Sequence, residues 1–236
     1  MTEKTINKIS LLFRPADCVL SVRNEFAGQI SRQRWALDTW HASEDDIVRI
    51  LAQATQLQQN TENVRIICQS PFFTLVPLAL FSQKDAHYFL DFQVNTVNST
   101  TIFNIIEPKE IAAVFAVPQM LVKSLSRFFN DAKIFLHLTE IINCKHNINV
   151  NFGQLYFAEN SFDILIFEKK RLIFYNSFKF NTKEDVLYFL TAIFEQFSLS
   201  FGQTELFIYN SDTQRDTIDF LKKSFKLLYL EKTLSF

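Results

Sequence analysis

Apolar and polar residues alternate near the N-terminus in a pattern that predicts strands. In residues 8–14 and again in 17–23, apolar side chains recur at every second position, as in half-buried strands. Residues 26–37 are more polar, which predicts a partly exposed third strand. The apolar run at 64–68 predicts a fourth. This part of the chain is therefore expected to form a sheet.

A helix is expected between the third and fourth of these strands. Ser43 can accept a hydrogen bond from the amide of Asp46, and the Asp46 carboxylate favours the positive end of the helix. Apolar residues follow at the spacing of one helix face. The residues expected to face the core are Ile47, Ile50, Leu51 and Ala54.

The middle of the chain has a mixed pattern. Residues 71–92 combine apolar runs with two prolines placed where short helices begin. Residues 101–106 and 112–117 predict two further strands. Pro118 stands where the first turn of a helix tolerates proline, and apolar residues continue at helical spacing after it. Residues 134–138 predict another strand.

The second half of the chain repeats the order of the first. Residues 150–157, 162–168 and 171–180 predict a three-strand meander, with a lysine turn between the last two strands. Residues 206–209 supply a strand that matches the one at 64–68. The order of three strands, one helix and one strand therefore occurs twice.

Helix caps strengthen this evidence for an internal repeat. Thr182 is expected to cap a helix together with Asp185, as Ser43 does with Asp46. Matching caps and matching periodicity together indicate a duplicated fold. A further helix and a closing strand are expected at 213–225 and 227–230.

Composition indicates a folded protein with an aromatic core. The 236 residues are 48% hydrophobic and 21% charged, which gives room for two lobes with real cores and argues against disorder. A net charge of −1 provides no global positive field, so no nucleic-acid partner is expected. The chain has 27 Phe but only 3 Gly. Because Gly28, Gly153 and Gly202 stand alone, glycine-rich phosphate loops are not expected.

Cysteine usage and hydropathy predict a cytoplasmic protein. Cys18, Cys68 and Cys144 are far apart, so a disulfide framework is not expected and a reducing compartment fits better. The N-terminus shows no signal-peptide pattern. The longest apolar run, 72–81, is shorter than the roughly 20 residues that cross a bilayer, so membrane insertion is not expected.

Several carboxylates are candidate catalytic groups. Ribonuclease-H-type catalysis gathers carboxylates around two divalent metals. Asp17 and Asp163 lie at the starts of predicted second strands, and Glu159 ends a predicted first strand. They are expected to face water instead, because charged residues are rarely buried unless paired. Glu184 and Asp185 lie in a first helical turn, which predicts a capping role.

Other candidate groups form weak patterns. His137, Cys144 and His146 include ligand types that suit zinc, but their spacing matches no strong motif and a fourth ligand is missing. A cysteine nucleophile paired with a histidine is no better supported. We expect no metal and no other cofactor.

The predicted hairpin of the second half carries basic and aromatic side chains. The basic run Lys169, Lys170 and Arg171 is typical of a solvated hairpin tip. Aromatic residues can stack on nucleic-acid bases, but at strand positions they indicate core or partner-facing rings. The aromatic residues concerned are Tyr175, Phe178 and Phe180.

The duplicated order resembles the architecture of actin and of ribonuclease-H-like proteins. LYFAENSFDILIFEKKRLIFYNSFKFNT resembles the first strands and phosphate loop of actin homologues in pilus assembly and cell division. AAVFAVPQMLVKSLSRFF resembles a strand, turn and helix of the extra subdomain in those proteins. Most of the chain resembles a Bacteroidetes family of uncharacterised proteins with an actin-like ATPase fold. The motifs concerned are the start of the first lobe, PFFTLVPLALF, VFAVP and RLIFYNSFKFNTKEDVLYFL.

The resemblance implies an α/β fold with two tandem ribonuclease-H-like, or actin-like ATPase, lobes. Each lobe is expected to contain a mixed five-stranded sheet with flanking helices. The expected division is a first lobe at 1–95, a connecting strand and helix segment at 96–147, and a second lobe at 148–236.

The resemblance also implies where a nucleotide phosphate would bind. Active relatives have Asp, Gly and small or hydroxyl residues between their first two strands, but residues 14–17 and 158–161 contain no glycine. We therefore expect a non-catalytic interaction or scaffold protein with an unidentified protein partner, and the oligomeric state stays open. The alternative is an atypical nucleotide-binding ATPase that uses the cleft between lobes. A metal-dependent nuclease is a third hypothesis.

Overall fold

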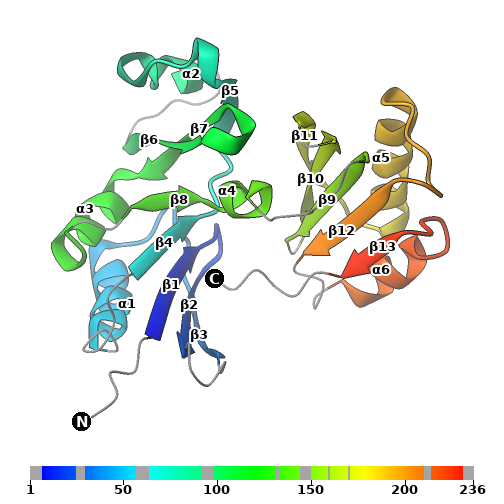
Figure 1. Cartoon of the computed structure of the whole chain (residues 1–236). Helices are drawn as coiled ribbons and strands as arrows, with labels where there is room; N and C mark the ends of the chain where they lie inside the picture. The colour runs from blue at the N-terminus through cyan, green and yellow to red at the C-terminus, as the bar shows by residue number, and fades with distance from the viewer. Residues whose placement is uncertain are drawn as a thin grey trace, which may run out of the picture. The chain divides into compact units, whose positions relative to one another are not determined.

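The structure is a computed structural model that divides into two compact units, Met1–Asn143 and Cys144–Ser235 (Figure 1). The units are described separately. The residues that the structure describes are 7–24, 30–56, 64–91, 98–130, 133–143, 150–158, 160–169, 171–209 and 214–230.

The first unit contains a mixed five-stranded sheet with the order β3-β2-β1-β4-β8. β1 is antiparallel to β2 and parallel to β4, so it is the strand at which the pairing direction changes. β3 is antiparallel to β2, and β8 is parallel to β4. The four strands predicted before residue 70 are confirmed, while residues 25–29 lie outside the described part. The strand bounds are β1 (Asn7–Phe13), β2 (Asp17–Asn24), β3 (Ile30–Ala36), β4 (Val64–Cys68) and β8 (Ile134–Leu136).

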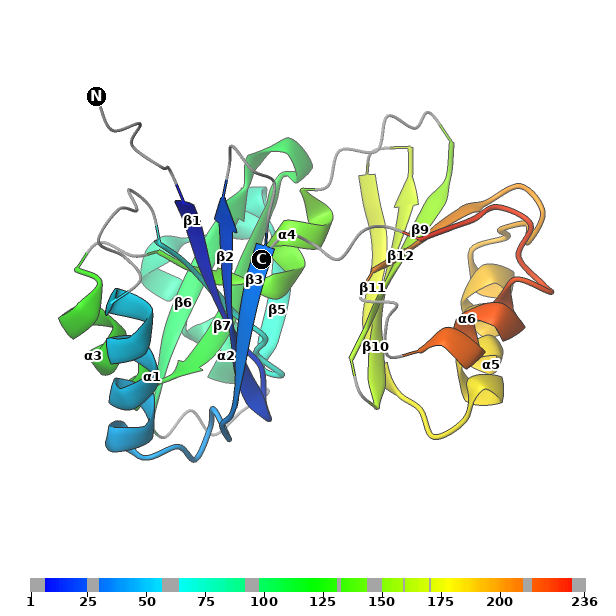
Figure 2. The ribbon, with the colours of Figure 1, turned by 90° about the horizontal axis from the view of Figure 1, so that it is seen from below.

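The helix α1 (Glu44–Gln56) begins at the predicted cap. The amide of Asp46 donates to Oγ of Ser43 at 3.2 Å, which satisfies one free donor of the first turn. The predicted apolar face is buried, as expected from its helical spacing. The helix α3 (Gln119–Phe128) packs beside α1 (Figure 2). Arg127 of α3 forms an ion pair with Glu44 of α1.

A smaller antiparallel sheet with the order β5-β7-β6 belongs to the first unit. Its central strand is buried because the other two strands flank it, and residues 112–117 are 0% exposed. The strands are β5 (Phe73–Pro77), β6 (Ser99–Ile106) and β7 (Ile111–Pro118). Residues 73–77 form the strand β5, although the sequence pattern of this region did not predict a particular element. Short helices accompany it: η2 (Leu78–Leu80), η3 (Gln83–Asp85), α2 (Tyr88–Asp91) and η4 (Glu107–Lys109).

One asparagine links this smaller sheet to the edge of the five-stranded sheet. Nδ2 of Asn104, on β6, donates to the carbonyl of Ile134 at 2.9 Å. Oδ1 of Asn104 accepts from the amide of Leu136 at 2.8 Å. The Asn104 amide therefore bonds β8 as a neighbouring strand would. β8 lies within the segment 96–147, so this segment contributes a strand to the first sheet.

The predicted strand 134–138 is shorter in the structure. β8 ends at Leu136, and the helix α4 (His137–Ile142) begins at the next residue. The helix was not predicted because it has only six residues and follows the strand directly, and because five of the six are buried, which leaves little helical periodicity in the sequence. Apolar runs of this length do not distinguish a strand from a buried helix.

The second unit has a five-stranded sheet with the order β11-β10-β9-β12-β13. Its pairing repeats that of the first sheet: β9 is antiparallel to β10 and parallel to β12. β11 is antiparallel to β10, and β13 is parallel to β12. The predicted duplication is therefore confirmed strand by strand. The bounds are β9 (Phe152–Phe157), β10 (Ser161–Glu168), β11 (Arg171–Lys179), β12 (Glu205–Tyr209) and β13 (Leu228–Leu230).

The helices α5 (Lys183–Gln196) and α6 (Arg215–Leu221) cover the same face of this sheet (Figure 2). Between them and the strands lies an aromatic core, in which the ring centroids of Phe194 and Phe225 are 5.2 Å apart. The helix predicted at 213–225 is shorter in the structure, because α6 ends at Leu221. No helix among the described residues is both long enough and apolar enough to cross a membrane.

The Asn104 contact yields a stability prediction. Asn104→Ala removes both hydrogen bonds to β8 and should lower the free energy of unfolding by about 1–3 kcal/mol, because two part-buried backbone groups lose their partner. Urea denaturation measures this change. Asn176→Ala, at an exposed position on β11, is the matched control and should change stability by less than about 0.5 kcal/mol. Equal effects of the two variants would contradict the role assigned to Asn104.

Candidate functional site

The candidate site is the turn between the first two strands of each unit, where the resemblance places a phosphate loop. The two turns share a hydrogen-bond pattern. In the first, the amide of Arg14 donates to the carbonyl of Asp17 at 2.8 Å. In the second, the amide of Ala158 donates to the carbonyl of Ser161 at 2.8 Å. The internal duplication therefore extends to the geometry of these turns.

Two arginines hold Asp17 in the first turn. Nε of Arg14 lies 2.6 Å from Oδ1 of Asp17, and Nη2 of Arg14 lies 2.7 Å from Oδ2. Arg34 of β3 forms a further ion pair with Oδ2. Asp17 is only 3% exposed, so the prediction that it faces water is wrong. The carboxylate is buried because two guanidinium groups compensate its charge.

Backbone groups of the same turn are also occupied. The hydroxyl of Thr39, in the loop after β3, donates to the carbonyl of Arg14, and the Thr39 amide donates to the carbonyl of Pro15 at 3.1 Å. The amide of Leu37 donates to the carbonyl of Ala16 at 3.1 Å. Pro15 has no N–H, and the Arg14 amide is already bonded. Two of the four residues of this turn therefore offer no free amide to a phosphate.

Arg34 is the member of this cluster that sequence reasoning missed. The strand register places Arg34 opposite Val19, two residues beyond Asp17 on β2. Side chains two residues apart share one face of a sheet, so Arg34 and Asp17 meet there. The sequence does show that Arg32 and Arg34 alternate in a strand predicted to be exposed. It does not show that Asp17 is the partner of Arg34, because that contact depends on the register of β3 against β2.

The second turn has different chemistry. Ser161 begins the second strand of its unit, as Asp17 does in the first, and Glu159 lies outside the described residues. Asp163 is 5% exposed, so the expectation that it faces water is also wrong. Its Oδ1 accepts from the hydroxyl of Tyr175 at 2.9 Å. Burial raises the pKa of Tyr175, and the neighbouring Asp163 carboxylate raises it further. The Tyr175 hydroxyl therefore stays protonated and donates the hydrogen bond.

The candidate zinc ligands are not brought together within the described residues. His137 is buried at the start of α4, where its ring packs against Phe73 with centroids 6.4 Å apart. Cys144 and His146 lie outside the described part of the chain. Among the described residues, no three His, Cys, Asp or Glu side chains gather closely enough to hold a metal ion.

The two cysteines within the described strands are structural. Both are buried free thiols on strands that flank β1. Burial raises the pKa of Cys68 to about 12. Burial and the neighbouring Asp17 carboxylate raise the pKa of Cys18, against a smaller effect of Arg14. Neither thiol forms the thiolate that a cysteine nucleophile requires near neutral pH.

Asp185, in the first turn of α5, takes part in capping the helix, as predicted. Oγ1 of Thr182 accepts from the amide of Asp185 at 3.2 Å. The Asp185 carboxylate accepts from the amides of Asn181 and Thr182, each at 2.9 Å. These backbone hydrogen bonds lower the pKa of Asp185. Asp185 is therefore engaged in helix capping.

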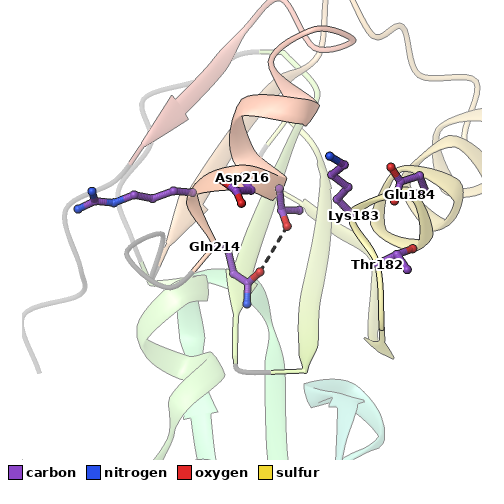
Figure 3. Close-up of a pocket in the computed structure, with 7 residues that line it drawn as sticks. Thr182, Lys183, Glu184, Gln214 and Asp216 are labelled. Carbon is purple, nitrogen blue, oxygen red and sulfur yellow. Dashed lines mark hydrogen bonds between the residues drawn. The ribbon is translucent and has the colours of Figure 1, made fainter.

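A pocket of about 520 Å³ lies in the second unit between the beginnings of α5 and α6 (Figure 3). Its charges balance, with Lys183 and Arg215 beside Glu184 and Asp216. The ammonium group of Lys183 lies 5.3 Å from the ring centroid of Phe220. The remaining lining residues are Thr182, Gln214 and Thr217. The lining shows no nucleophile activated by a neighbouring base.

The basic and aromatic groups of the second hairpin also have structural roles. Nη2 of Arg171 pairs with Oε2 of Glu168 at 2.8 Å at the exposed hairpin end. Phe178 stacks on Phe189 of α5, with ring centroids 4.4 Å apart. Phe180 is buried in the same core. The core interpretation of these two rings is confirmed.

Comparisons with known proteins establish the fold. A family model described as "Protein of unknown function (DUF3822)" matches residues 1–226. A protein with actin-like ATPase fold and unknown function from Bacteroides thetaiotaomicron VPI-5482 aligns with a TM-score of 0.80 and 19% identity. The alignment covers 98% of this chain and 92% of that one. The chain thus has the actin-like ATPase fold, with two mixed five-stranded sheets and flanking helices, as predicted.

More distant structures share this fold. The PilM–PilN type IV pilus biogenesis complex aligns with a TM-score of 0.57 and 10% identity, over 95% of this chain and 88% of that one. Ethanolamine utilization protein EutJ from Carboxydothermus hydrogenoformans aligns with a TM-score of 0.50 and 7% identity. That alignment covers 97% of this chain and 85% of EutJ. No curated protein sequence matches the chain.

The Asp17 cluster yields a mutational prediction. Asp17→Ala should lower the free energy of unfolding by about 1–3 kcal/mol, because it leaves two guanidinium groups without their shared carboxylate. Asp38→Ala removes a solvent-exposed carboxylate and should have a clearly smaller effect on stability. Urea denaturation of both variants at neutral pH compares them. A loss for Asp17→Ala no larger than the control's would refute the buried-cluster interpretation.

The buried thiols yield a second prediction. In a Cys144→Ser background, Cys18 and Cys68 should not react with a thiol reagent at pH 8 until the protein unfolds, because both are buried and hold raised pKa values. The measurement is the rate of labelling with and without urea. Rapid labelling of the folded protein would show that a reactive thiol exists and would reopen the nucleophile hypothesis.

Proposed function

Since the chain belongs to the DUF3822 family, we propose that it is a non-catalytic interaction protein, in which an actin-like fold is kept and phosphate binding is lost. The single observation that carries this proposal is the Arg14–Asp17–Arg34 cluster in the first turn. The cluster occupies the place where the resemblance puts a nucleotide phosphate. An aspartate held by two arginines is poorly placed to order a metal ion.

The second turn supports the same proposal. It contains no glycine, and its first amide is used within the turn itself. A phosphate loop needs several amides that point at the anion. The nearby acidic residue, Asp163, is buried and bonded to Tyr175. In each turn at least one amide is already used, and the carboxylate described nearby is buried and bonded, which does not favour nucleotide hydrolysis.

The proposed role is to bind a protein partner. The same fold takes part in protein binding elsewhere, since PilM occurs in a complex with PilN. The two units bury extensive cores without a catalytic group in the described turns or pocket. A protein that evolution keeps for a stable shape and a specific binding surface would have a structure of this kind. The competing proposal is an atypical nucleotide-binding ATPase.

A nucleotide titration tests the proposal. Millimolar ATP with magnesium should leave the melting temperature unchanged and give no heat in isothermal titration. A ligand present at 100 times its Kd would stabilise the folded state by about 2.7 kcal/mol. That corresponds to roughly 5–10 °C for a chain of this size. Binding of ATP in the micromolar range that depends on the metal would overturn the proposal in favour of the ATPase.

A further inference from the structure

One face of the first sheet carries a set of basic side chains. Side chains alternate between the faces of a strand, so Lys8 and Ser10 lie opposite the core residues Ile9, Leu11 and Phe13 of β1. The strand register assigns the neighbouring side chains of β2, β3 and β4 to the same face. We call this surface the basic face, and its cations are Lys8, Arg23, Arg32, Arg34 and Arg65.

The register arranges these residues in rows across the sheet. One row runs through Arg32, Ser21, Ser10 and Arg65 on four adjacent strands. The two arginines thus flank two serines, of which Ser21 is 4% exposed and Ser10 is 8% exposed. Lys8 pairs directly with Arg23 in the next row. The register thus sets two like charges directly opposite each other on neighbouring strands, a placement that sheets usually avoid.

Few carboxylates compensate the basic face within the described residues. Asp17 lies between Arg14 and Arg34, and Glu140 of α4 pairs with Arg65. No ion pair links Arg23 or Arg32 to a carboxylate in the described part of the chain. The side chains of Arg34 and Arg65 remain 67% and 48% exposed despite their partners. Among the described residues, this face thus carries more cations than carboxylates, although the whole chain has a net charge of −1.

The second unit shows that the fold itself does not require these charges. In the equivalent register, the pair formed by Lys8 and Arg23 is replaced by Phe152 and Phe167. Those two rings stack with centroids 4.6 Å apart and are buried. Phe207 likewise occupies the position of Arg65. The same sheet thus carries a basic face in one unit and an aromatic face in the other.

Among the described strands, the basic face ends at an edge of the sheet that no other strand covers. β3 is the terminal strand in the order β3-β2-β1-β4-β8, and residues 31–34 are exposed. An edge strand presents unpaired N–H and C=O groups to an added strand. Charges on such an edge repel a second copy of the same strand. A strand of opposite charge is the partner that this edge accepts.

We propose that the edge of β3 and the basic face bind an extended acidic segment of a partner protein by strand addition. The proposal rests on the proposed function, because it names the chemistry of the partner. Alternate residues of an added strand are about 7 Å apart, as Arg32 and Arg34 are along β3. Acidic side chains at alternate positions of the added strand would therefore lie beside Arg32 and Arg34. Backbone pairing supplies affinity and the arginines supply specificity.

A strand partner fits these features better than a nucleic acid does. Nucleic-acid binding draws its affinity from many phosphate contacts, whereas this face offers only a few cations, of which Arg34 and Arg65 already contact carboxylates. An open backbone edge gives directed hydrogen bonds that only another polypeptide strand can repeat. The experiment below uses single-stranded DNA to separate the two partner classes.

Peptide binding to the full chain tests the proposal. The probe is a fluorescein-labelled peptide of alternating glutamate and threonine, measured by fluorescence anisotropy at low salt. The test variant combines Arg23→Glu with Arg32→Glu, which spares the Arg14–Asp17–Arg34 cluster. The matched control combines Lys223→Glu with Lys226→Glu, two exposed positions of the second unit, and changes the net charge equally. Circular dichroism of each variant confirms that it is folded.

We expect the test variant to weaken peptide binding by more than about tenfold and the control by less than about twofold. The peptide should also slow hydrogen exchange of β3 amides, while the same peptide with alternate N-methyl groups should bind much more weakly. Equal losses in both variants, full binding of the N-methylated peptide, or tighter binding of single-stranded DNA of equal charge would each overturn the proposal. ATP binding by the same preparation would instead overturn the proposed function.

Discussion

The ion cluster around Asp17 determines what the first turn of this protein can do. A carboxylate that is 3% exposed is stable only with close cations, and Arg14 and Arg34 supply them from the turn itself and from β3. Their contacts fix the turn against the third strand, and Thr39 fixes it further through its hydroxyl and amide. The groups that would bind an anion in an active relative therefore stabilise the fold.

Most of the fold follows from local sequence signals, whereas the site depends on contacts between distant residues. The caps at Ser43 and Thr182 were predicted because each motif spans only four residues and contains its own partner. β8 and α4 were harder to predict because strand and helix meet at Leu136 and His137 within one apolar run. The burial of Asp17 was not predicted because it needs Arg34, whose position depends on the register of β3.

The two units show how one topology supports different surfaces. Both sheets have the same strand order and the same pairing directions. The face that packs on the helices is apolar in the second unit, where Leu155 and Phe157 join the core with α5. The corresponding residues of β1, Leu11 and Phe13, are fully buried too. The opposite faces have diverged, because the constraint of packing on α1 or α5 does not act on them.

The Asn104 contact means that the smaller sheet meets β8 through one side chain and not through a ladder of backbone hydrogen bonds. A backbone ladder ties the register of one strand to that of the next, residue by residue. A side-chain amide imposes that requirement at one position only. Exposed positions of the smaller sheet can therefore change without shifting the register of the five-stranded sheet. The amide at position 104 and the packing of Phe73 on His137 are contacts that such changes would have to keep.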